Sequence, residues 1–588
     1  RAMAAMAVLV MFFVAAALAA AGGAELVEHT FVVSQVKLNR LCNDTLVTVV
    51  NGQFPGPAIE VNEGDSVAVQ VVNKSPYGLT IHWHGVKLQL NCWADGAGMI
   101  TQCPIQPNKN FTYRFDVAGQ KGTLWWHAHV GSLRASIHGA LIIRPRSGAS
   151  SYPFPKPDKE IPIVIGEWWE MDLDQLDKNL RNGYHLDMPR AATINGKPGD
   201  LYNCSVELYN LNFTGTVKDS NIVKVEHGKT YLLRIVNAAL SSEYYLKIAG
   251  HKFTVVAADA NYVKPYITDV IAIAPGETVD ALLVTDAHPA GRYYMVAKAS
   301  QSPKPVPQIP LFITRGIVQY SEGPRKEEEK ALSDSSTSSI MAPEMPDEHD
   351  AATSFYFHGN LTSLQPQPVP ANVHEHLFYA LDGGFFCRKG ESSCNNDTNM
   401  MGMVNNVSFQ LPTTTPLLQA HYHGNMSSIG TLRELPDRAP RMFNYSETLE
   451  PTSKATSVRR LRYNATVEIV FQSPVLADTY ANPMHLHGHD FLVLAQGFGQ
   501  YNAETDVATY NLVDPPVRNT VHVPLFGWAA VRFVTNNPGV WFMHCHFGHH
   551  SSSGMAAAFV VENGPTLDST LPPPPEDFPS CKTYNSRV

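Results

Sequence analysis

The chain has few charged residues and no basic run. Asp, Glu, Lys and Arg make up 16% of its 588 residues, and the formal net charge is −9. Surfaces that bind nucleic acid need clustered Lys and Arg side chains. The composition therefore argues against nucleic acid as a partner.

Beyond the N-terminus the chain also lacks an apolar run long enough to cross a bilayer. The one long apolar run extends from about residue 4 to residue 21, after Arg1 and before Gly22, Gly23 and Ala24. A basic residue, an apolar run and a small-residue cleavage site predict a secretory signal peptide over residues 1–24. We therefore expect a secreted, extracellular protein with no membrane association after cleavage.

Sequons for N-linked glycans support export independently, because such glycans belong to secreted chains. The eleven N-x-Ser/Thr sequons lie at Asn43, Asn73, Asn110, Asn203, Asn212, Asn360, Asn396, Asn406, Asn425, Asn444 and Asn464. We expect N-linked glycans on the mature protein.

Cysteine is scarce, with eight residues in the whole chain. If Cys545 binds a metal as a thiolate, seven cysteines remain, and at least one of them has no partner within the chain. Cys387 and Cys394 are close enough in sequence to form a local loop bridge. The other pairings stay open.

The length of the chain predicts two to four domains, since one hydrophobic core does not grow this large. Gly (40 residues) and Pro (42 residues) punctuate short alternating apolar stretches, which is typical of loop-rich all-β domains. Residues 326–330 are charged and residues 334–339 are rich in Ser and Thr, as in a linker. We predict three β-rich domains and one linker, over residues 25–148, 149–318, 319–354 (the linker) and 355–588 (with a C-terminal tail).

Histidine carries the strongest signal. His-x-His pairs occur seven times among 24 histidines, whereas random placement gives roughly one. Four pairs lie towards the two ends of the chain: His82/His84, His127/His129, His485/His487 and His544/His546. We interpret the other three as bystanders: His374/His376, His421/His423 and His487/His489.

The fourth pair has a cysteine at its centre. Successive side chains on a β-strand point to opposite faces, so each pair directs two imidazoles the same way. In His544-Cys545-His546 the same alternation sends Cys545 to the other face. One strand then touches two metal sites, which suggests electron transfer between a thiolate-ligated metal and a histidine cluster.

The residues after Cys545 favour copper at the thiolate site. His550 and Met555 follow five and ten residues later. Imidazole binds copper, zinc, iron and nickel, but a lone thiolate with histidine and a weak axial thioether suits a blue-copper centre. Tetrahedral zinc is the alternative, yet zinc cysteines usually come in Cys-x2-Cys pairs, and Cys545 has no such companion.

Several long motifs resemble those of the plant laccases, which are multicopper oxidases, and the resemblance covers essentially the whole mature chain. The Trp-Trp-His-Ala-His sequence at residues 125–129 is similar to laccase rather than to ascorbate oxidase. The motifs lie at residues 82–85, 93–96, 101–104, 122–129, 485–488 and 544–555.

This resemblance implies an all-β fold of three cupredoxin-like, Greek-key β-barrel domains that hold four copper ions. His82 and His485 would bind the type 2 copper. Cys545, His550 and an axial Met555 would bind the type 1 copper. The type 3 pair would be bound by His84, His127, His129, His487, His544 and His546.

The implied activity is one-electron oxidation of phenolic substrates, such as lignin precursors or related plant phenolics, in the apoplast or cell wall. Electrons pass through Cys545 to the cluster, where four of them reduce O2 to water. Asp95 matches an acid that helps to move protons to bound oxygen in the family; by residue type alone it is equally a turn residue before Gly96. We expect the enzyme to be a monomer.

Asn482 departs from the family pattern. It replaces the first histidine of the usual His-Pro-x-His-Leu-His motif, which is a type 1 ligand. Its amide oxygen matches Cu(I) poorly and binds Cu(II) more weakly than imidazole. Asn482 could still coordinate the metal or leave room for water. Alternatively, His421, His423 or His489 could replace the missing type 1 ligand.

Gly548 is the second departure, because the family usually has an acid two residues after His546. That acid helps proton delivery or orients ligands. Its loss predicts slower oxygen reduction. The neighbouring His549 could relay protons, although we expect residues 548 and 549 to continue the strand, where adjacent side chains point to opposite faces.

Two alternatives to a phenol oxidase remain open. One is an oxidase of the same class that acts on metal ions or ascorbate. The other is a secreted copper-binding or structural cell-wall glycoprotein that has reduced or absent oxidase activity because of Asn482. All eight cluster histidines are present, which argues against the second alternative.

Overall fold

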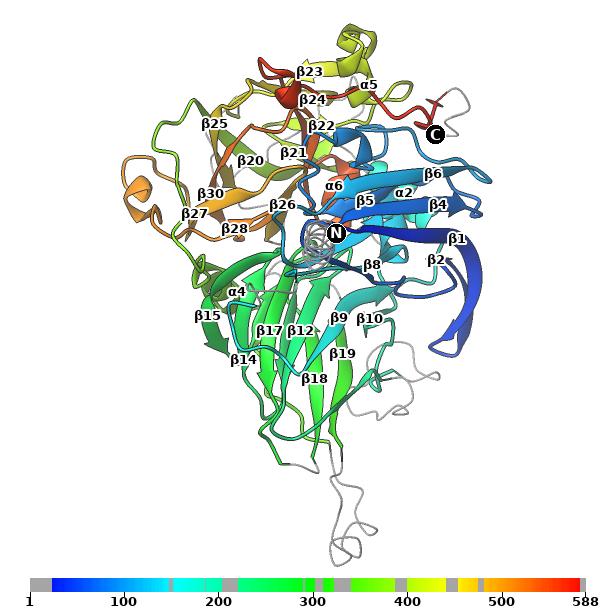
Figure 1. Ribbon diagram of the computed structural model, residues 1–588, viewed down its shortest axis with the longest axis vertical. Coiled ribbons are helices and arrows are strands. Elements are labelled where there is room, and N and C mark those ends of the chain that lie inside the picture. Colours follow the sequence, from blue (N-terminus) through cyan, green and yellow to red (C-terminus); the bar gives the residue numbers. More distant parts are fainter. Residues whose placement is uncertain are drawn as a thin grey trace, which may run out of the picture.

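The computed structural model (Figure 1) describes most of the chain. Part of the predicted signal peptide (residues 1–23), the Cys387 and Cys394 bridge, and residues 322–339 of the predicted linker lie outside the described residues. The described residues are 24–146, 152–185, 187–202, 220–288, 291–301, 310–321, 340–386, 399–439, 453–473 and 481–581.

The first unit consists of two four-stranded sheets around a common core. Its strands alternate as the sequence predicts: in residues 110–116, Phe111, Tyr113 and Phe115 are buried, whereas Asn110 and Arg114 are exposed. One sheet contains β2 (Asn43–Val50), β1 (Leu26–Arg40), β4 (Ser66–Asn73) and β6 (Asn110–Asp116). The other contains β3 (Ile59–Asn62), β8 (His138–Arg144), β7 (Gly122–Ala128) and β5 (Ile81–His84).

The second unit has a six-stranded and a five-stranded sheet that share one apolar core. The larger sheet contains β10 (Ala191–Ile194), β9 (Lys159–Trp168), β12 (Thr230–Asn237), β17 (Thr278–Val284), β14 (Phe253–Ala258) and β15 (Asn261–Thr268). The smaller contains β11 (Ile222–Val225), β19 (Ile313–Tyr320), β18 (Arg292–Ala299), β13 (Tyr244–Ile248) and β16 (Ile271–Ile273). Strand β19 thus extends to the beginning of the predicted linker.

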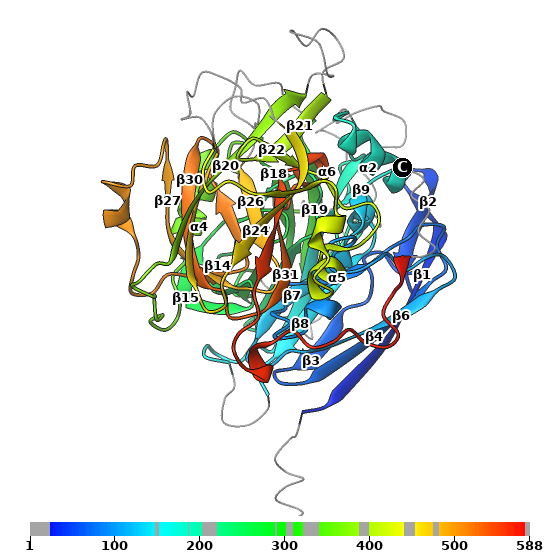
Figure 2. The ribbon, with the colours of Figure 1, turned by 90° about the horizontal axis from the view of Figure 1, so that it is seen from above.

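The third unit is one continuous 13-stranded sheet system. Figures 1 and 2 show this unit in yellow-green to red, beside both the first unit in blue to cyan and the second, which is mostly green. Its strands are β20 (Glu375–Phe386), β21 (Asn399–Val404), β22 (Val407–Phe409), β23 (Leu432–Glu434), β24 (Ser453–Leu461), β25 (Thr466–Gln472), β26 (Asn482–Leu486), β27 (Phe491–Phe498), β28 (Val517–Arg518), β29 (Thr520–Val523), β30 (Gly527–Val534), β31 (Gly539–Cys545) and β32 (Ala556–Val561).

Helices are few and short, and two of them lie close to the histidine pairs. Asp172 caps α2 by accepting hydrogen bonds from the backbone N–H groups of Asp174 and Gln175. Helix α2 packs against α6 and against the 3₁₀ helix η2. Within the described residues, the α-helices are α2 (Leu173–Arg181), α4 (Ala351–Gly359), α5 (Leu417–Tyr422) and α6 (Gly548–Ser553), and the 3₁₀ helices are η1 (Cys92–Ala94), η2 (Gly131–Ala135), η4 (Met426–Ser428), η5 (Asp506–Thr509) and η6 (Leu567–Ser569).

Residues 548–550 correct one expectation. We treated Gly548 and His549 as strand residues whose side chains alternate, but they begin helix α6 directly after the end of β31. None of the helices that the structure describes is long and apolar enough to span a membrane.

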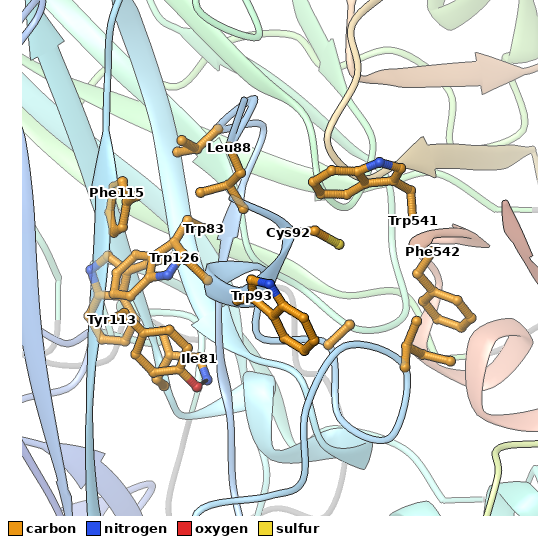
Figure 3. Close-up of a cluster of buried hydrophobic side chains, with 14 of the residues drawn as sticks. Ile81, Trp83, Leu88, Cys92, Trp93, Tyr113, Phe115, Trp126, Trp541 and Phe542 are labelled. Carbon is orange, nitrogen blue, oxygen red and sulfur yellow. Dashed lines mark hydrogen bonds between the residues drawn. The ribbon is translucent and has the colours of Figure 1, made fainter. Parts of the chain in front are cut away.

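The core of the first unit continues into the third (Figure 3). Trp541 and Phe542 of β31 belong to the same buried cluster as Trp83 of β5 and Trp93 of η1. The thiol of Cys92 donates to the carbonyl oxygen of Val540 at 3.2 Å. Burial of these aromatic side chains therefore fixes β31 against the first unit.

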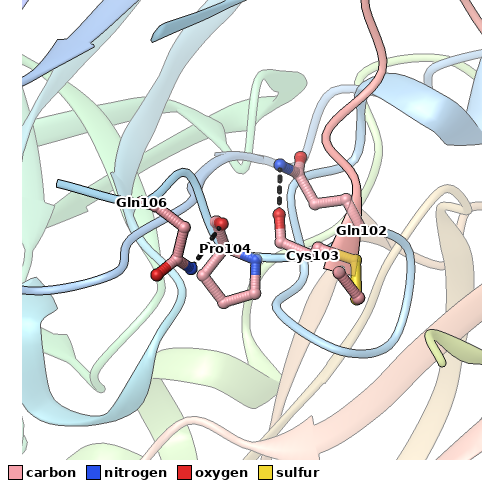
Figure 4. The surroundings of a disulfide bond; sticks show 5 residues. Gln102, Cys103, Pro104 and Gln106 are labelled. Atoms are coloured by element: carbon pink, nitrogen blue, oxygen red, sulfur yellow. Dashed lines mark hydrogen bonds between the residues drawn. A yellow bond between two sulfur atoms is a disulfide. The ribbon is translucent and has the colours of Figure 1, made fainter. Parts of the chain in front are cut away.

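A disulfide joins the loop after β5 to the C-terminal segment. Cys103 pairs with Cys581 across 478 residues of sequence (Figure 4). Within the described part of the chain, Cys92 and Cys545 are the free cysteines, and both are buried. The sequence predicts that, besides Cys545, at least one of the seven other cysteines has no disulfide partner, and Cys92 is such a cysteine.

The structure separates the sequons by exposure. Asn73 and Asn406 are buried, and the Asn73 amide donates to the carbonyl oxygens of Tyr77 and Ile105. Asn203, Asn212, Asn396 and Asn444 lie outside the described residues. The exposed sequons are Asn43, Asn110, Asn360, Asn425 and Asn464.

We predict that Asn73 and Asn406 carry no glycan in the folded protein, because a glycan needs an exposed amide nitrogen. Mass spectrometry of peptides from the secreted protein tests this, with the exposed Asn110 and Asn464 as internal controls. Full occupancy of Asn73 would contradict its buried position.

Candidate metal centres

Two antiparallel strand pairs supply the histidines, one from the first unit and one from the third. Strand β5 pairs with β7 so that His82 lies opposite His127. Strand β26 pairs with β31 so that His485 lies opposite His544. Opposed side chains on antiparallel strands point to the same face. Both units therefore direct imidazoles into the space between them.

All eight histidines of the four predicted pairs meet in this space. His82 stacks on His487 with ring centroids 3.8 Å apart, and His84 stacks on His485 at 3.7 Å. Each stack joins a ring of the first unit to a ring of the third. The sets whose ligand atoms lie within 4.8 Å of one another include His82, His84 and His485; His84, His127 and His546; and His129, His487 and His544.

The outer nitrogens of the rings are held by hydrogen bonds. Nδ1 of His127 donates to the carbonyl oxygen of Ala128 at 2.9 Å, and Nδ1 of His485 donates to that of Asn519 at 2.8 Å. A proton on Nδ1 leaves a lone pair on the inner Nε2. No partner exists among the described residues for Nε2 of His82, His127, His129, His485 and His546, or for Nδ1 of His84.

Burial keeps seven of these imidazoles in the neutral form. Burial, reinforced by the neighbouring rings, lowers the pKa of His84, His485 and His487 well below its usual range. It lowers the pKa of His129 to about 3. Neutral imidazoles with unpaired, inward lone pairs are costly to bury, unless a cation binds to them. The donor set fits transition metal ions, copper among them.

Asp95 supports this cluster from the first unit. Its carboxylate accepts from Nδ1 of His487 at 2.9 Å, and its carbonyl oxygen accepts from Nδ1 of His82 at 2.7 Å. The next residue, Gly96, has φ +75°, and a Cβ there would lie 1.8 Å from the carbonyl oxygen of Ile81. Only glycine permits this close approach, which holds Asp95 behind both histidines.

The second unit supplies none of the eight histidines, yet it holds several of them. Both the first and the second unit contact the ring of His546. From the first unit, the Arg134 guanidinium of η2 contacts Nδ1 of His546 at 3.1 Å. From the second unit, Gly276 packs against the same ring so closely that a Cβ would lie 2.8 Å from it. The sequence pattern gave no sign of these contacts, since neither residue lies in a histidine pair.

A buried ion network connects the second unit to the residues that hold His84 and His485. The Asp259 carboxylate accepts from the Arg518 guanidinium at 2.8 Å and from the backbone N–H of Asn519 at 3.2 Å. Asn519 in turn holds Nε2 of His84 through its side-chain oxygen, at 3.1 Å. Sequence reasoning missed this network, because its members are far apart in the chain.

A second centre lies on the other face of β31. Sγ of Cys545 lies 3.3 Å from Nδ1 of His550 and 3.5 Å from Oδ1 of Asn482. Nδ1 of His550 lies 3.0 Å from the same amide oxygen. Met555 is fully buried in the same apolar cluster as Cys545, and its carbonyl oxygen accepts from the Cys545 backbone N–H. All four predicted residues are therefore neighbours.

The amide of Asn482 has a defined orientation. Its nitrogen donates to the Ser473 hydroxyl at 3.3 Å, so its oxygen faces Cys545 and His550. The three histidines named as substitutes lie elsewhere: His489 packs against Phe533 and Trp541, and His421 and His423 belong to the region of α5.

The pair His374/His376 also lies apart from both centres. Nδ1 of His374 accepts from the Thr466 backbone N–H, and Nδ1 of His376 contacts Glu468. Both contacts fix the start of β20 beside β25, which is a structural role.

Comparison with known proteins agrees with this geometry. Three multicopper oxidase family models match residues 32–148, 159–323 and 411–565. Rice laccase-15 (Oryza sativa subsp. japonica) is 55% identical over 96% of this chain and 95% of its own length. The chain belongs to the plant laccases of the multicopper oxidase family. Rice laccase-19 is 50% identical over 95% of this chain and 94% of its own length.

Solved structures show the same fold. The laccase from Botrytis aclada superposes with a TM-score of 0.69, at 24% identity over 94% of this chain and 89% of its own. Fet3p, described as a multicopper oxidase that functions in iron import, gives 0.70 at 20% identity, over 91% and 90%. The predicted all-β fold of three cupredoxin-like domains is confirmed, and the plant laccase family implies copper binding.

We predict that the buried network between the second and third units stabilises the fold in a pH-dependent way. Burial raises the pKa of Glu277, but His358 and Arg518 outweigh it and lower this pKa to about 2. Glu277 therefore contributes stability above its usual pKa of 4.5 and loses it as the pH falls towards 2.

Glu277→Gln should lower the free energy of unfolding by about 3 kcal/mol at pH 7 and by less at pH 3, because it breaks a buried ion pair. Chemical denaturation at both pH values tests this. The exposed Glu28→Gln variant is the control. An equal loss at both pH values would contradict a role for the Glu277 charge.

Proposed function

We propose that the chain is a secreted laccase, which oxidises phenolic substrates by one electron each and reduces O2 to water. The observation that carries the proposal is the meeting of eight inward-facing imidazoles next to a buried Cys545–His550 pair. Membership of the plant laccases supports phenolic compounds of the cell wall as substrates.

The proposed copper sites follow the three histidine sets. His82 and His485 would hold the type 2 ion, and the type 3 pair would be held by His84, His127 and His546 and by His129, His487 and His544. Bound copper would supply one-electron redox chemistry and a site for O2. The unpaired inner nitrogens support this assignment, since each lacks any other partner among the described residues.

Strand β31 supplies the route between the two centres. Cys545 lies between His544 and His546 in the chain, and its carbonyl oxygen accepts from Nδ1 of His544 at 2.9 Å. This hydrogen bond and two peptide bonds give a short, rigid connection through bonds. Burial of Cys545 in an apolar cluster excludes water from its thiolate.

Asn482 would be the third ligand of the type 1 ion, through its amide oxygen. The hydrogen bond from its nitrogen to Ser473 supports this role, because it directs the oxygen towards Cys545 and His550. An amide oxygen is harder than imidazole and favours Cu(II) over Cu(I). Copper held in this way would have a low reduction potential, which suits easily oxidised phenols.

Export, N-linked glycans at exposed sequons, an extracellular location in the cell wall and a monomeric state belong to the same proposal. The apolar N-terminal run and the sequons support secretion. The alternative of a copper glycoprotein without oxidase activity is not favoured, because the laccase relatives span almost the whole chain.

Copper content, the visible spectrum and oxygen uptake of the purified protein test the proposal together. We expect four copper ions per chain, a thiolate-to-copper absorption band, and uptake of one O2 for every four phenol molecules oxidised. Three copper ions without the band, and no oxygen uptake with phenols, would exclude a working laccase.

We predict that Asn482→His raises the reduction potential of the type 1 site, since imidazole stabilises Cu(I) better than an amide oxygen does. The equilibrium constant for electron transfer from a phenol should rise about tenfold, which corresponds to about 1.4 kcal/mol. Redox titration of the visible band measures it.

The exposed Asn536→His variant, in the same unit and outside every sequon, is the control for adding a histidine. If Asn482→His leaves both the band and the potential unchanged, Asn482 is not a ligand.

A further inference from the structure

A cavity of about 490 Å³ reaches the histidine cluster from the side of α2 and α6. His129 and His544 line its inner end, and Asp174, Lys178 and Arg181 of α2 line it as well. The α2 side chains are between 42% and 48% exposed, so the cavity connects the cluster to solvent.

Two carboxylates line this cavity within the described chain, Asp174 and Asp177. Asp174 is about half exposed and paired with Lys178 at 2.9 Å. The Asp177 carboxylate is only 11% exposed and lies against the backbone of Gly131, two residues after His129. Asp177 is therefore the acid that the fold brings close to the cluster on this side.

The two carboxylate oxygens of Asp177 have different hydrogen-bond partners. Oδ2 accepts from Nε of Arg181 at 2.6 Å, and Oδ1 accepts from the Ser552 hydroxyl at 2.7 Å. Ser552 belongs to α6, and the hydroxyl of the preceding Ser551 lies 3.5 Å from Nδ1 of His544. One oxygen is thus fixed by a cation, and the other accepts from Ser552, the residue next to the serine that contacts His544.

Ser552 lies one helical turn after Gly548, the position where the family usually has an acid. Residues four apart on a helix share a face. The Asp177–Ser552 pair therefore approaches the face of α6 from which the family acid would act. A carboxylate from α2 reaches this place when α6 itself offers none.

We propose that Asp177 relays protons to the oxygen-reducing cluster in place of the acid that is absent at Gly548. The inference rests on the proposed function. Reduction of one O2 to two waters consumes four electrons, which four phenols supply, and four protons. The four phenols also release the four protons as they are oxidised. For each proton, the Asp177 carboxylate takes H⁺ from a hydronium ion in the cavity, which leaves as water. The new O–H bond of Asp177 then breaks as an O–H bond of the product water forms, directly or through Ser552.

Other charged and titratable groups face the same region. Burial lowers the pKa of His549 well below its usual range, and it lowers that of Lys454. The groups are Asp174, Lys178 and Arg181 on α2, His185 after α2, Arg134 on η2, His549 and His550 on α6, and Lys454 across the cavity on β24. Asp177 is the carboxylate among them that bonds to α6.

This relay changes what Gly548 implies. Slow oxygen reduction is then expected of a chain that has neither an acid at position 548 nor Asp177. The parent chain keeps one of them.

The test compares Asp177→Asn with Asp174→Asn, a matched change on the same helix and cavity. Reoxidation of the fully reduced protein by O2, followed by rapid mixing between pH 5 and pH 8, should slow about tenfold or more in Asp177→Asn alone, since a positioned acid contributes at least that much. Anaerobic reduction by a phenol, the copper content and the visible band should stay as in the parent.

Gly548→Asp in the Asp177→Asn background is the rescue. A Cβ at position 548 would lie 3.1 Å from Leu240 and 3.4 Å from the Arg134 guanidinium, so an aspartate fits with small shifts. We expect it to restore most of the lost rate. Equal reoxidation rates in Asp177→Asn and the parent, or a loss that Gly548→Asp does not repair, would overturn the relay.

A measurement on the copper-free protein separates this inference from the proposed function. Infrared difference spectra between pH 7 and pH 3, with isotope-labelled aspartate, should contain a carboxylic acid band that is absent in Asp177→Asn and shifted in Ser552→Ala. Identical spectra in all three proteins would refute a protonatable Asp177 beside Ser552, whether or not the chain is a laccase.

Discussion

The burial of imidazoles from four His-x-His pairs in one cluster, with inward nitrogens that have no partner among the described residues, is the constraint on which the structure depends. Such a cluster is costly without a bound cation, so every ring has to be fixed from outside. Backbone carbonyl oxygens and Asp95 hold the rings of both strand pairs. The second unit, without any of these histidines, closes the cluster through Gly276 and through Asp259, which fixes the segment around Asn519.

Strand β31 joins this cluster to the thiolate centre and to the core. Its aromatic residues Trp541 and Phe542 pack into the first unit, while Cys545 faces the apolar core of the third. The same strand that positions two cluster histidines therefore also positions the thiolate. Damage to its packing should disturb both centres together, whereas a change at Asn482 acts on the outer centre.

Local sequence patterns predicted the fold and the histidine cluster, whereas contacts between residues far apart in the chain could not be predicted from them. Alternation on strands predicted which way the residues at 544–546 point, and the motifs predicted the family and its fold. Helix α6 was treated as strand, because six residues are too few for a helical period to emerge. Arg134, Asp259 and Asp177 were not predicted, since each acts on a residue hundreds of positions away and belongs to no motif.

Anomalous X-ray scattering from crystals of the copper-loaded protein, recorded on both sides of the copper absorption edge, tests the central claim most directly. We predict three peaks among the eight histidines and a fourth between Cys545, His550 and Asn482. Peaks at the cluster alone would show that Asn482 leaves the outer centre without copper, and an absence of peaks among the histidines would contradict the copper cluster itself.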